Sequence, residues 1–152
     1  MGRSRQAALA DLGVAMQRYQ RTVQSFDDAV GRILGLGPAD LRCLDVLTEG
    51  ARSAGELATA TGLRPAATTA LIDRLAERGF VRRVPDAADR RRVLVEMTDE
   101  GYRRTGALYG PMIEEAGRPL EGFTVTEIER MRALLDGFTE VTERHARGLA
   151  QG

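Results

Sequence analysis

The sequence predicts a mainly α-helical chain with one small β-hairpin, in which long N- and C-terminal helices flank a compact middle. Three observations predict this fold class. Apolar residues recur at alternating steps of three and four near both ends of the chain. Helical patterns joined by a turn of about four residues occupy the middle. Two short runs of β-branched and aliphatic residues follow directly and enclose an arginine-rich loop.

The first long helix is expected over residues 5–35. Its apolar positions form a heptad seam, which is typical of a helix that packs against an equally long partner. The seam comprises Leu9, Leu12, Met16, Tyr19, Val23, Phe26, Val30 and Ile33. Gly35 and Gly37 are expected to end this helix, and Pro38 can open the next one.

Three shorter helices are predicted in the middle of the chain. The first covers residues 38–50. The second covers 53–62, where Ser53 and Glu56 have the spacing of a capping box. The third covers 64–79. Two helices joined by a short turn make the helix-turn-helix pattern.

A β-hairpin is predicted directly after these helices. The runs FVRRV (80–84) and VLVEM (93–97) are typical of strands, with residues 85–92 as the connecting loop. Thr98 is expected to cap a further helix. Together these elements predict a winged helix-turn-helix.

The last helix is predicted to start with a second capping box, formed by Thr124 and Glu127. Its seam again steps by three and four through Ile128, Met131, Leu135, Phe138, Thr142, His145 and Leu149. The two terminal helices could pack within one chain. Their length beyond the middle favours an interface shared between two chains.

Positive charge is concentrated around the hairpin, although the whole chain has a net charge of zero. Residues 64–92 carry eight arginines and four acidic residues, a net charge of +4. In a winged helix, the second helix of the motif fits the DNA major groove, and an arginine-rich wing reaches the minor groove. Asp86 and Asp89 are expected to hold the arginine side chains through bidentate pairs. The alternative is a solvated loop with incidental charge.

The stretch LIDRLAERGFVRRVPDAADRRRVLVEMTDEG, residues 71–101, resembles the signature of the MarR family of bacterial transcription regulators. The matching parts are Asp-Arg-Leu at 73–75, Gly79, the strand at 80–83, Asp86 with Asp-Arg-Arg at 89–91, and Met-Thr-x-x-Gly at 97–101. The resemblance implies a single domain over 1–152, with a winged-helix DNA-binding lobe at 36–100 and a helical dimerisation region at 5–35 and 101–150. It also implies a homodimer that binds pseudo-palindromic operators, usually as a repressor released by a small molecule.

The resemblance assigns roles to individual residues of the wing and of the helix before it. Arg91 is the candidate for the minor groove, with Arg90 beside it and Asp89 orienting both. Arg74 would contact phosphate or brace the wing.

Major-groove contacts would come from the helix at 64–79. Thr68 and Thr69 would face the groove. Ala70 departs from the family pattern, because many relatives have a polar or basic residue there. Arg64, at the front of the same helix, would supply the missing charge, and shape readout by the wing would carry more of the specificity.

The resemblance also suggests a ligand pocket and a dimer interface. Met16, Tyr19 and Phe26 would line the pocket between the arms and the lobe, although such residues are more often core. A small aromatic or phenolic ligand is the implied inducer. The interface residues are expected to be Leu9, Leu12, Phe138, His145 and Leu149.

Other function classes have little support. The single cysteine, Cys43, and the single histidine, His145, make neither a metal-ligand cluster nor a convincing catalytic pair, so no metal, cofactor or enzymatic activity is expected. No apolar run approaches the roughly 20 residues of a membrane span. Asp11 interrupts the first apolar stretch, so no signal peptide is expected, and a single cysteine fits the reducing cytoplasm. The remaining alternative is a winged helix with weakened DNA binding that acts through protein contacts.

Overall fold

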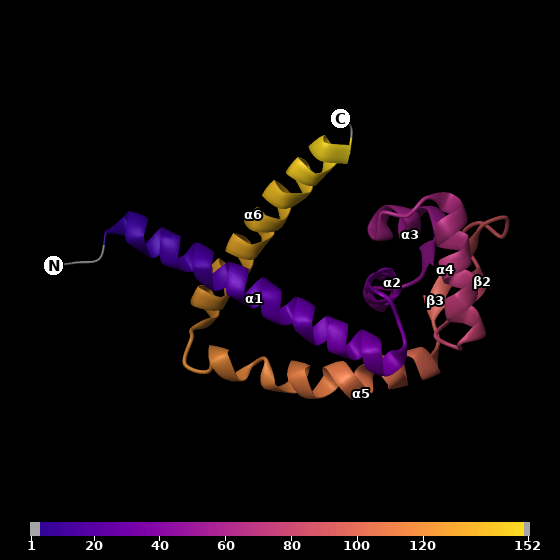
Figure 1. The fold of residues 1–152 in the computed structure, drawn as a ribbon, viewed down its shortest axis with the longest axis horizontal. Coiled ribbons are helices and arrows are strands. Elements are labelled where there is room, and N and C mark those ends of the chain that lie inside the picture. The colour runs from indigo at the N-terminus through magenta and orange to yellow at the C-terminus, as the bar shows by residue number, and fades with distance from the viewer. Residues whose placement is uncertain (1–3, 151–152) are drawn as a thin grey trace. The chain divides into compact units, whose positions relative to one another are not determined.

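A computed structural model describes residues 4–150 and confirms the predicted fold class (Figure 1). The elements in order are α1 (Arg5–Leu34), α2 (Pro38–Thr48), β1 (Arg52–Ser53), α3 (Ala54–Thr61), α4 (Pro65–Glu77), β2 (Val81–Pro85), β3 (Val93–Met97), α5 (Asp99–Glu115), the 3-10 helix η1 (Arg118–Leu120) and α6 (Val125–Ala150). Contacts within the chain divide it into two compact units, one ending at Leu108 and the other beginning at Tyr109. The division falls inside α5.

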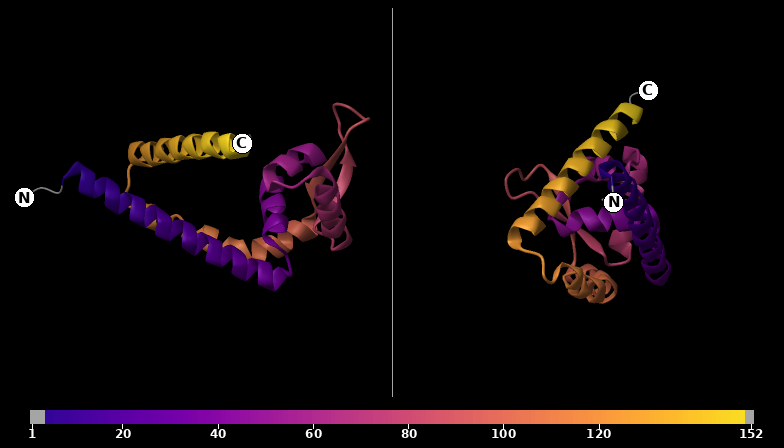
Figure 2. Two further views of the ribbon diagram at one scale, coloured as in Figure 1. Left: turned by 45° about the horizontal axis from the view of Figure 1, so that its top comes forward. Right: turned by 90° about the vertical axis from the view of Figure 1, so that its left-hand side faces the viewer.

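Helix α1 is most buried near its C-terminal end. Val30, Gly31 and Leu34 are its buried residues. The helix ends at Gly35, whose φ of 65° is left-handed and therefore suits glycine. Towards the N-terminus most of the seam is exposed, with Tyr19 at 71%, although Met16 is half-buried. Figures 1 and 2 show α1 as one long rod.

The helix-turn-helix is formed by α3 and α4, packed on α2. As predicted, α3 begins with a capping box: the Ser53 N–H donates to Glu56 Oε2 at 2.8 Å, and the Glu56 N–H donates to Ser53 Oγ at 3.3 Å. The hydrogen bonds from Ser53 lower the pKa of the Glu56 carboxyl. This carboxylate cap is therefore present above the carboxyl's ordinary pKa and is lost as the pH falls through the lowered one.

The wing is an antiparallel sheet of three strands in the order β1-β3-β2. The predicted hairpin is confirmed, with Val81 opposite Met97 and Pro85 opposite Val93. The two-residue strand β1 was not predicted, and it pairs with β3 on the side away from β2. In the left view of Figure 2 the loop between β2 and β3 projects from the lobe, residues 36–100.

The lobe has one apolar core between the three helices and the sheet. Its largest fully buried side chains are Phe80, Leu47, Leu57, Leu71, Ile72, Leu75, Val95, Thr68 and Cys43. The start of α5 closes this core. The Thr98 hydroxyl donates to the Gly79 carbonyl at 2.6 Å and accepts from the Gly101 N–H at 2.9 Å. Thr98 therefore caps α5 as predicted and ties it to the wing.

The second unit consists of the last part of α5, η1 and α6. The predicted second capping box is present, since the Thr124 N–H donates to Glu127 Oε2 at 2.7 Å and the Glu127 N–H donates to Thr124 Oγ1 at 3.3 Å. The hydrogen bond from the Thr124 backbone lowers the pKa of the Glu127 carboxyl. The short helix η1 was not predicted. Within residues 4–150, no helix has both the length and the apolar character needed to cross a membrane.

Candidate nucleic-acid interface

Helix α4 presents one face to the core and one to solvent. Leu71, Ile72 and Leu75 are buried, and so is Thr68, which is only 1% exposed. The Thr68 hydroxyl donates to the Arg64 carbonyl at 3.1 Å. The prediction that Thr68 faces the major groove is therefore wrong. Thr68 lies three residues before Leu71 and four before Ile72, and this spacing places it on the apolar face.

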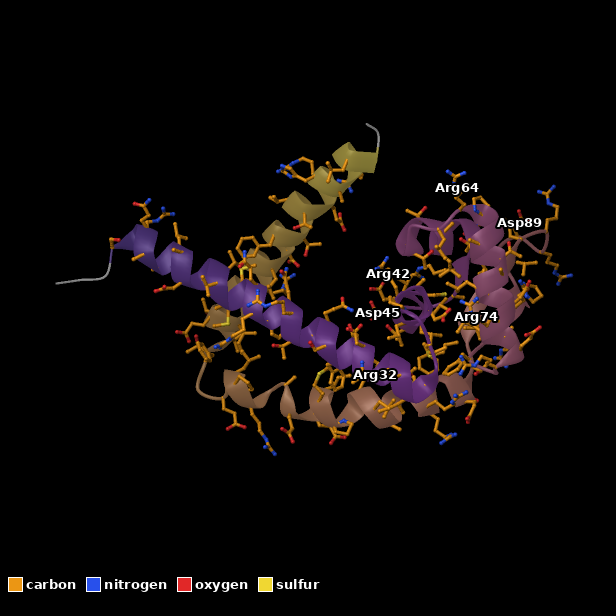
Figure 3. All side chains as sticks on the ribbon, in the orientation of Figure 1. Arg32, Arg42, Asp45, Arg64, Arg74 and Asp89 are labelled. Atoms are coloured by element: carbon orange, nitrogen blue, oxygen red, sulfur yellow. The ribbon has the colours of Figure 1, made fainter. Side chains whose placement is uncertain are left out.

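Thr69 and Arg64 are on the exposed face of α4. The Thr69 hydroxyl donates to the Pro65 carbonyl at 3.1 Å, so its oxygen can still accept a hydrogen bond. Arg64 is the N-cap residue of α4. Figure 3 shows its side chain directed outward from the start of this helix. Both residues are on the solvent-facing side of α4, as their predicted role requires.

The wing tip is held by its two aspartates through the backbone. Asp86 Oδ1 accepts from the Ala88 N–H at 2.8 Å, and Asp89 Oδ1 accepts from the Arg91 N–H at 3.0 Å. Each is an Asx turn, in which a side-chain oxygen replaces a backbone acceptor two residues earlier in the chain. The Arg92 N–H also donates to the Asp89 carbonyl at 2.8 Å. The tip therefore has a defined shape without DNA.

The bidentate pairs predicted for these aspartates are absent from the described residues. Asp89 Oδ1 reaches the Arg91 side chain only through Nε, at 3.4 Å. Asp86 Oδ2 lies 3.7 Å from Arg92 Nη1. These contacts are too long for a bidentate arginine–carboxylate pair, whose N–H···O distances are about 2.7–2.9 Å. The aspartates orient the chain that carries the arginines, and they leave the guanidinium groups largely uncommitted.

Several arginines of residues 64–92 are committed to the protein itself. The pairs are Arg74 with Asp40 at 2.5 Å, Arg82 with Glu96 at 2.7 Å, and Arg83 with Asp73 at 2.6 Å. Arg78 binds backbone carbonyls at the end of α1. These side chains hold the lobe together. The net charge of +4 on residues 64–92 is therefore larger than the positive charge available to bind a polyanion.

Arg74 was predicted to contact phosphate or to brace the wing. Its partner Asp40 is only 5% exposed and also accepts the Gly37 N–H at 2.9 Å, at the start of α2. Arg74 therefore braces α2, and the bracing prediction is wrong. The wing is instead tied to α4 by Arg83 and Asp73.

Three arginines of residues 64–92 are the most available, and Arg92 is less so because its half-exposed guanidinium stays 3.7 Å from Asp86 Oδ2. The Arg91 side chain is 92% exposed. Arg64 and Arg90 are exposed and form no ion pair with another residue of the described range 4–150. One of the three stands at the start of α4 and two at the wing tip. This is the arrangement that a helix in the major groove and a wing in the minor groove require.

We expect the backbone role of Asp89 to be visible in DNA binding. Asp89→Asn keeps the oxygen that accepts the Arg91 N–H, so affinity should stay within about threefold of the wild type. Asp89→Ala removes that acceptor and loosens the tip, and it should weaken binding of the dimer about tenfold, at roughly 0.7 kcal/mol for the hydrogen bond lost in each protomer. Fluorescence anisotropy with one duplex checks this. Equal losses in both variants would show that the carboxylate charge matters instead.

Cys43 is buried in α2. Burial, helped by the negative charge of Asp40, raises the pKa of its thiol from 9.0 to about 11. A thiolate is the reactive form, so we expect Cys43 in the folded protein to react with a thiol reagent at pH 8 at least about a hundredfold more slowly than in the unfolded protein. Absorbance of the released thiol product, with and without guanidinium chloride, measures the ratio. Fast labelling of the folded protein would contradict it.

The residues predicted for the ligand pocket and the dimer interface are distributed over both units. Met16 and Phe26 are half-buried, whereas Tyr19 is largely exposed. Leu9, Leu12, His145 and Leu149 are exposed, and Phe138 is half-buried. His145 Nδ1 lies 2.8 Å from the Val141 carbonyl oxygen of its own helix. Within residues 4–150, no three His, Cys, Asp or Glu side chains gather as a metal site.

Comparisons with known proteins agree with this geometry. A family model described as the MarR family matches residues 34–92. The helix-turn-helix-type transcriptional regulator YcgE of Bacillus subtilis is 34% identical over 127 residues, which are 83% of this chain and 82% of that protein.

Solved structures resemble this fold over nearly its whole length. A MarR family protein from Bacillus stearothermophilus has a TM-score of 0.66 at 21% identity, covering 93% of this chain and 99% of its own. CouR from Rhodococcus jostii RHA1, solved with bound p-coumaroyl-CoA, has a TM-score of 0.60 at 29% identity, covering 84% of this chain and 91% of its own.

Proposed function

This chain belongs to the MarR family of winged helix-turn-helix transcription regulators, and from that premise we propose that it is a homodimeric repressor of pseudo-palindromic operators, released by a small ligand. It is a DNA-binding regulator and not an enzyme. The observation that carries the proposal is the set of uncommitted guanidinium groups, Arg64, Arg90 and Arg91, on a wing and helix whose shape is fixed without DNA. The proposal places the protein in the cytoplasm, where bacterial DNA lies.

Two features support a homodimer. The N-terminal part of α1 exposes a heptad seam that includes Leu9 and Leu12, and α6 separately exposes a second seam that includes Leu135 and Leu149. Exposed seams of this length are unstable in water unless a long partner covers them. A second copy of the chain offers matching seams, and a twofold axis then matches the symmetry of the operator.

Support for a small ligand comes from a relative and from residue type. CouR was solved with bound p-coumaroyl-CoA, an aromatic thioester. Here Met16, Tyr19 and Phe26 supply apolar and aromatic surface on α1. We propose an aromatic or phenolic acid, or a thioester of one, as the inducer. A ligand that binds the folded protein raises its melting temperature, so a thermal-shift screen of such compounds tests this. No shift with any of them contradicts ligand control.

The DNA proposal is tested by selecting bound fragments from random duplex DNA and then varying the salt concentration. Three available arginines per protomer correspond to six per dimer, so the slope of log affinity against log salt should be about −5. A slope near −14 would mean that the committed arginines also bind phosphate. Failure to enrich any duplex at low salt would reject the proposal and favour a protein partner for this winged helix.

A further inference from the structure

Arg78 joins the end of the recognition helix to the end of the long N-terminal helix. It is the C-cap residue of α4. Its guanidinium donates through Nη1 to the Gly35 carbonyl at 2.6 Å and through Nη2 to the Leu34 carbonyl at 2.5 Å. These are terminal carbonyls of α1, which have no partner within their own helix and lie at the negative end of its dipole. The cation therefore meets two acceptors and a favourable field.

A buried aromatic ring and a second arginine complete this connection. The Arg78 guanidinium lies 5.6 Å from the centroid of the Phe80 ring, and the Arg104 guanidinium lies 4.0 Å from it. Arg104 Nη1 also donates to the Arg78 carbonyl at 3.2 Å. Leu34, Gly35, Arg78, Phe80 and Arg104 thus form one cluster, the Arg78 junction. It ties the ends of α1 and α4 and the start of α5 together.

The Arg78 junction lies at one end of α4, so a small rotation of α4 about it moves the opposite end of the helix by a large distance. The exposed N-terminal end of α4, with Arg64 and Thr69, begins about 20 Å from Arg78 along the helix, at ~1.5 Å per residue. A rotation of about 10° at the junction would move that end by about 3.5 Å, close to the ~3.4 Å rise of one base pair along a strand.

We infer that Arg78 is a positioning residue that sets the operator spacing which the dimer accepts. The inference rests on the proposed function, because it needs two lobes joined through their α1 helices and bound to one duplex. A planar guanidinium that holds two carbonyls fixes the direction of α4 relative to α1. A lysine ammonium keeps the charge but has no fixed fork. Arg78 touches no base in this role, and it acts through the placement of Arg64 and Thr69.

The test measures affinity against half-site spacing. Selected half-sites are placed at centre-to-centre distances from 8 to 13 base pairs in single steps, and dissociation constants are measured for the wild type, R78K, R78Q and the control R103Q. Arg103 is an exposed arginine paired with Glu100 on α5, so R103Q removes the same charge outside the junction. Circular dichroism and melting curves accompany each variant.

The wild type and R103Q should bind the best spacing at least about tenfold more tightly than its neighbours. R78Q should bind all spacings within about threefold of one another, with an unchanged salt slope, and R78K should lie between the two. A loss of stability alone would lower all affinities together and leave the profile intact.

Two results overturn the inference separately from the proposed function. A folded R78Q with the wild-type spacing profile overturns it. If R78Q does not fold, R78K decides the question, and a wild-type profile in R78K overturns it because charge alone then suffices. A wild type that binds no duplex rejects the proposed function, and the inference is rejected with it.

Discussion

Replacing Arg91 with alanine is expected to weaken binding of the dimer to its operator by about a hundredfold. Each half-site loses one guanidinium from the minor groove, at about 1.4 kcal/mol or tenfold per contact, and the dimer has two half-sites. The effect should be largest on operators with A·T-rich flanks, where the minor groove is narrow and its negative potential is concentrated. The salt slope should also fall by about 2.

The matched control is Arg103→Ala, which removes one positive charge from an exposed i,i+3 ion pair with Glu100. An exposed pair of this kind contributes little, so DNA affinity should change by less than about threefold. Fluorescence anisotropy with A·T-rich and G·C-rich flanks shows whether the Arg91 side chain enters the minor groove. If Arg91→Ala loses the same factor on both flanks, the side chain does not enter the minor groove.

The parts of the fold that depend on neighbouring residues could be predicted from the sequence. Both capping boxes form as their spacing requires, and the glycine at 35 ends α1 in the left-handed conformation. The hairpin also forms, because its strands have β-branched residues and its loop has turn residues. By contrast, the strand β1 is two residues long, and it is recognisable as a strand only through its pairing with β3, which lies far along the chain.

The site was predictable as a region but not atom by atom. Charge density places the predicted interface at α4 and the wing, and the arginines at 64, 90 and 91 are exposed there. The partners of Arg74 and Arg78 could not be predicted from the sequence, because they lie 34 to 44 residues earlier in the chain. Sequence patterns indicate contacts between residues three or four apart in a helix. Contacts between residues far apart in the chain appear only in the folded structure. Thr68 is different, since its spacing from Leu71 and Ile72 already indicated the buried face.

Gly101→Ala is expected to lower the free energy of unfolding by about 3 kcal/mol or more, because the added methyl group has no room at this position of α5. The first turn of α5 lies directly on the wing, and a Cβ atom at residue 101 would overlap the Phe80 carbonyl oxygen and lie 2.8 Å from Met97 Cγ. That carbonyl cannot move aside, because it accepts the Thr98 N–H at 3.0 Å. The methyl group therefore separates α5 from the core. Thermal unfolding should shift down by about 10 °C.

Gly106→Ala is the matched control, because it adds the same methyl group to the same helix, where a Cβ atom meets nothing within 4 Å. Alanine is a better helix former than glycine, so this variant should be stabilised by about 0.5–1 kcal/mol. Both variants must be melted at one protein concentration, since dimerisation contributes to apparent stability. Two variants that melt together would mean that α5 does not rest on the Phe80 carbonyl, and the connection from the wing through Thr98 to α5 would have to be abandoned. Opposite shifts, with Gly101→Ala lower and Gly106→Ala higher, identify backbone contact rather than helix propensity as the reason for a glycine at 101.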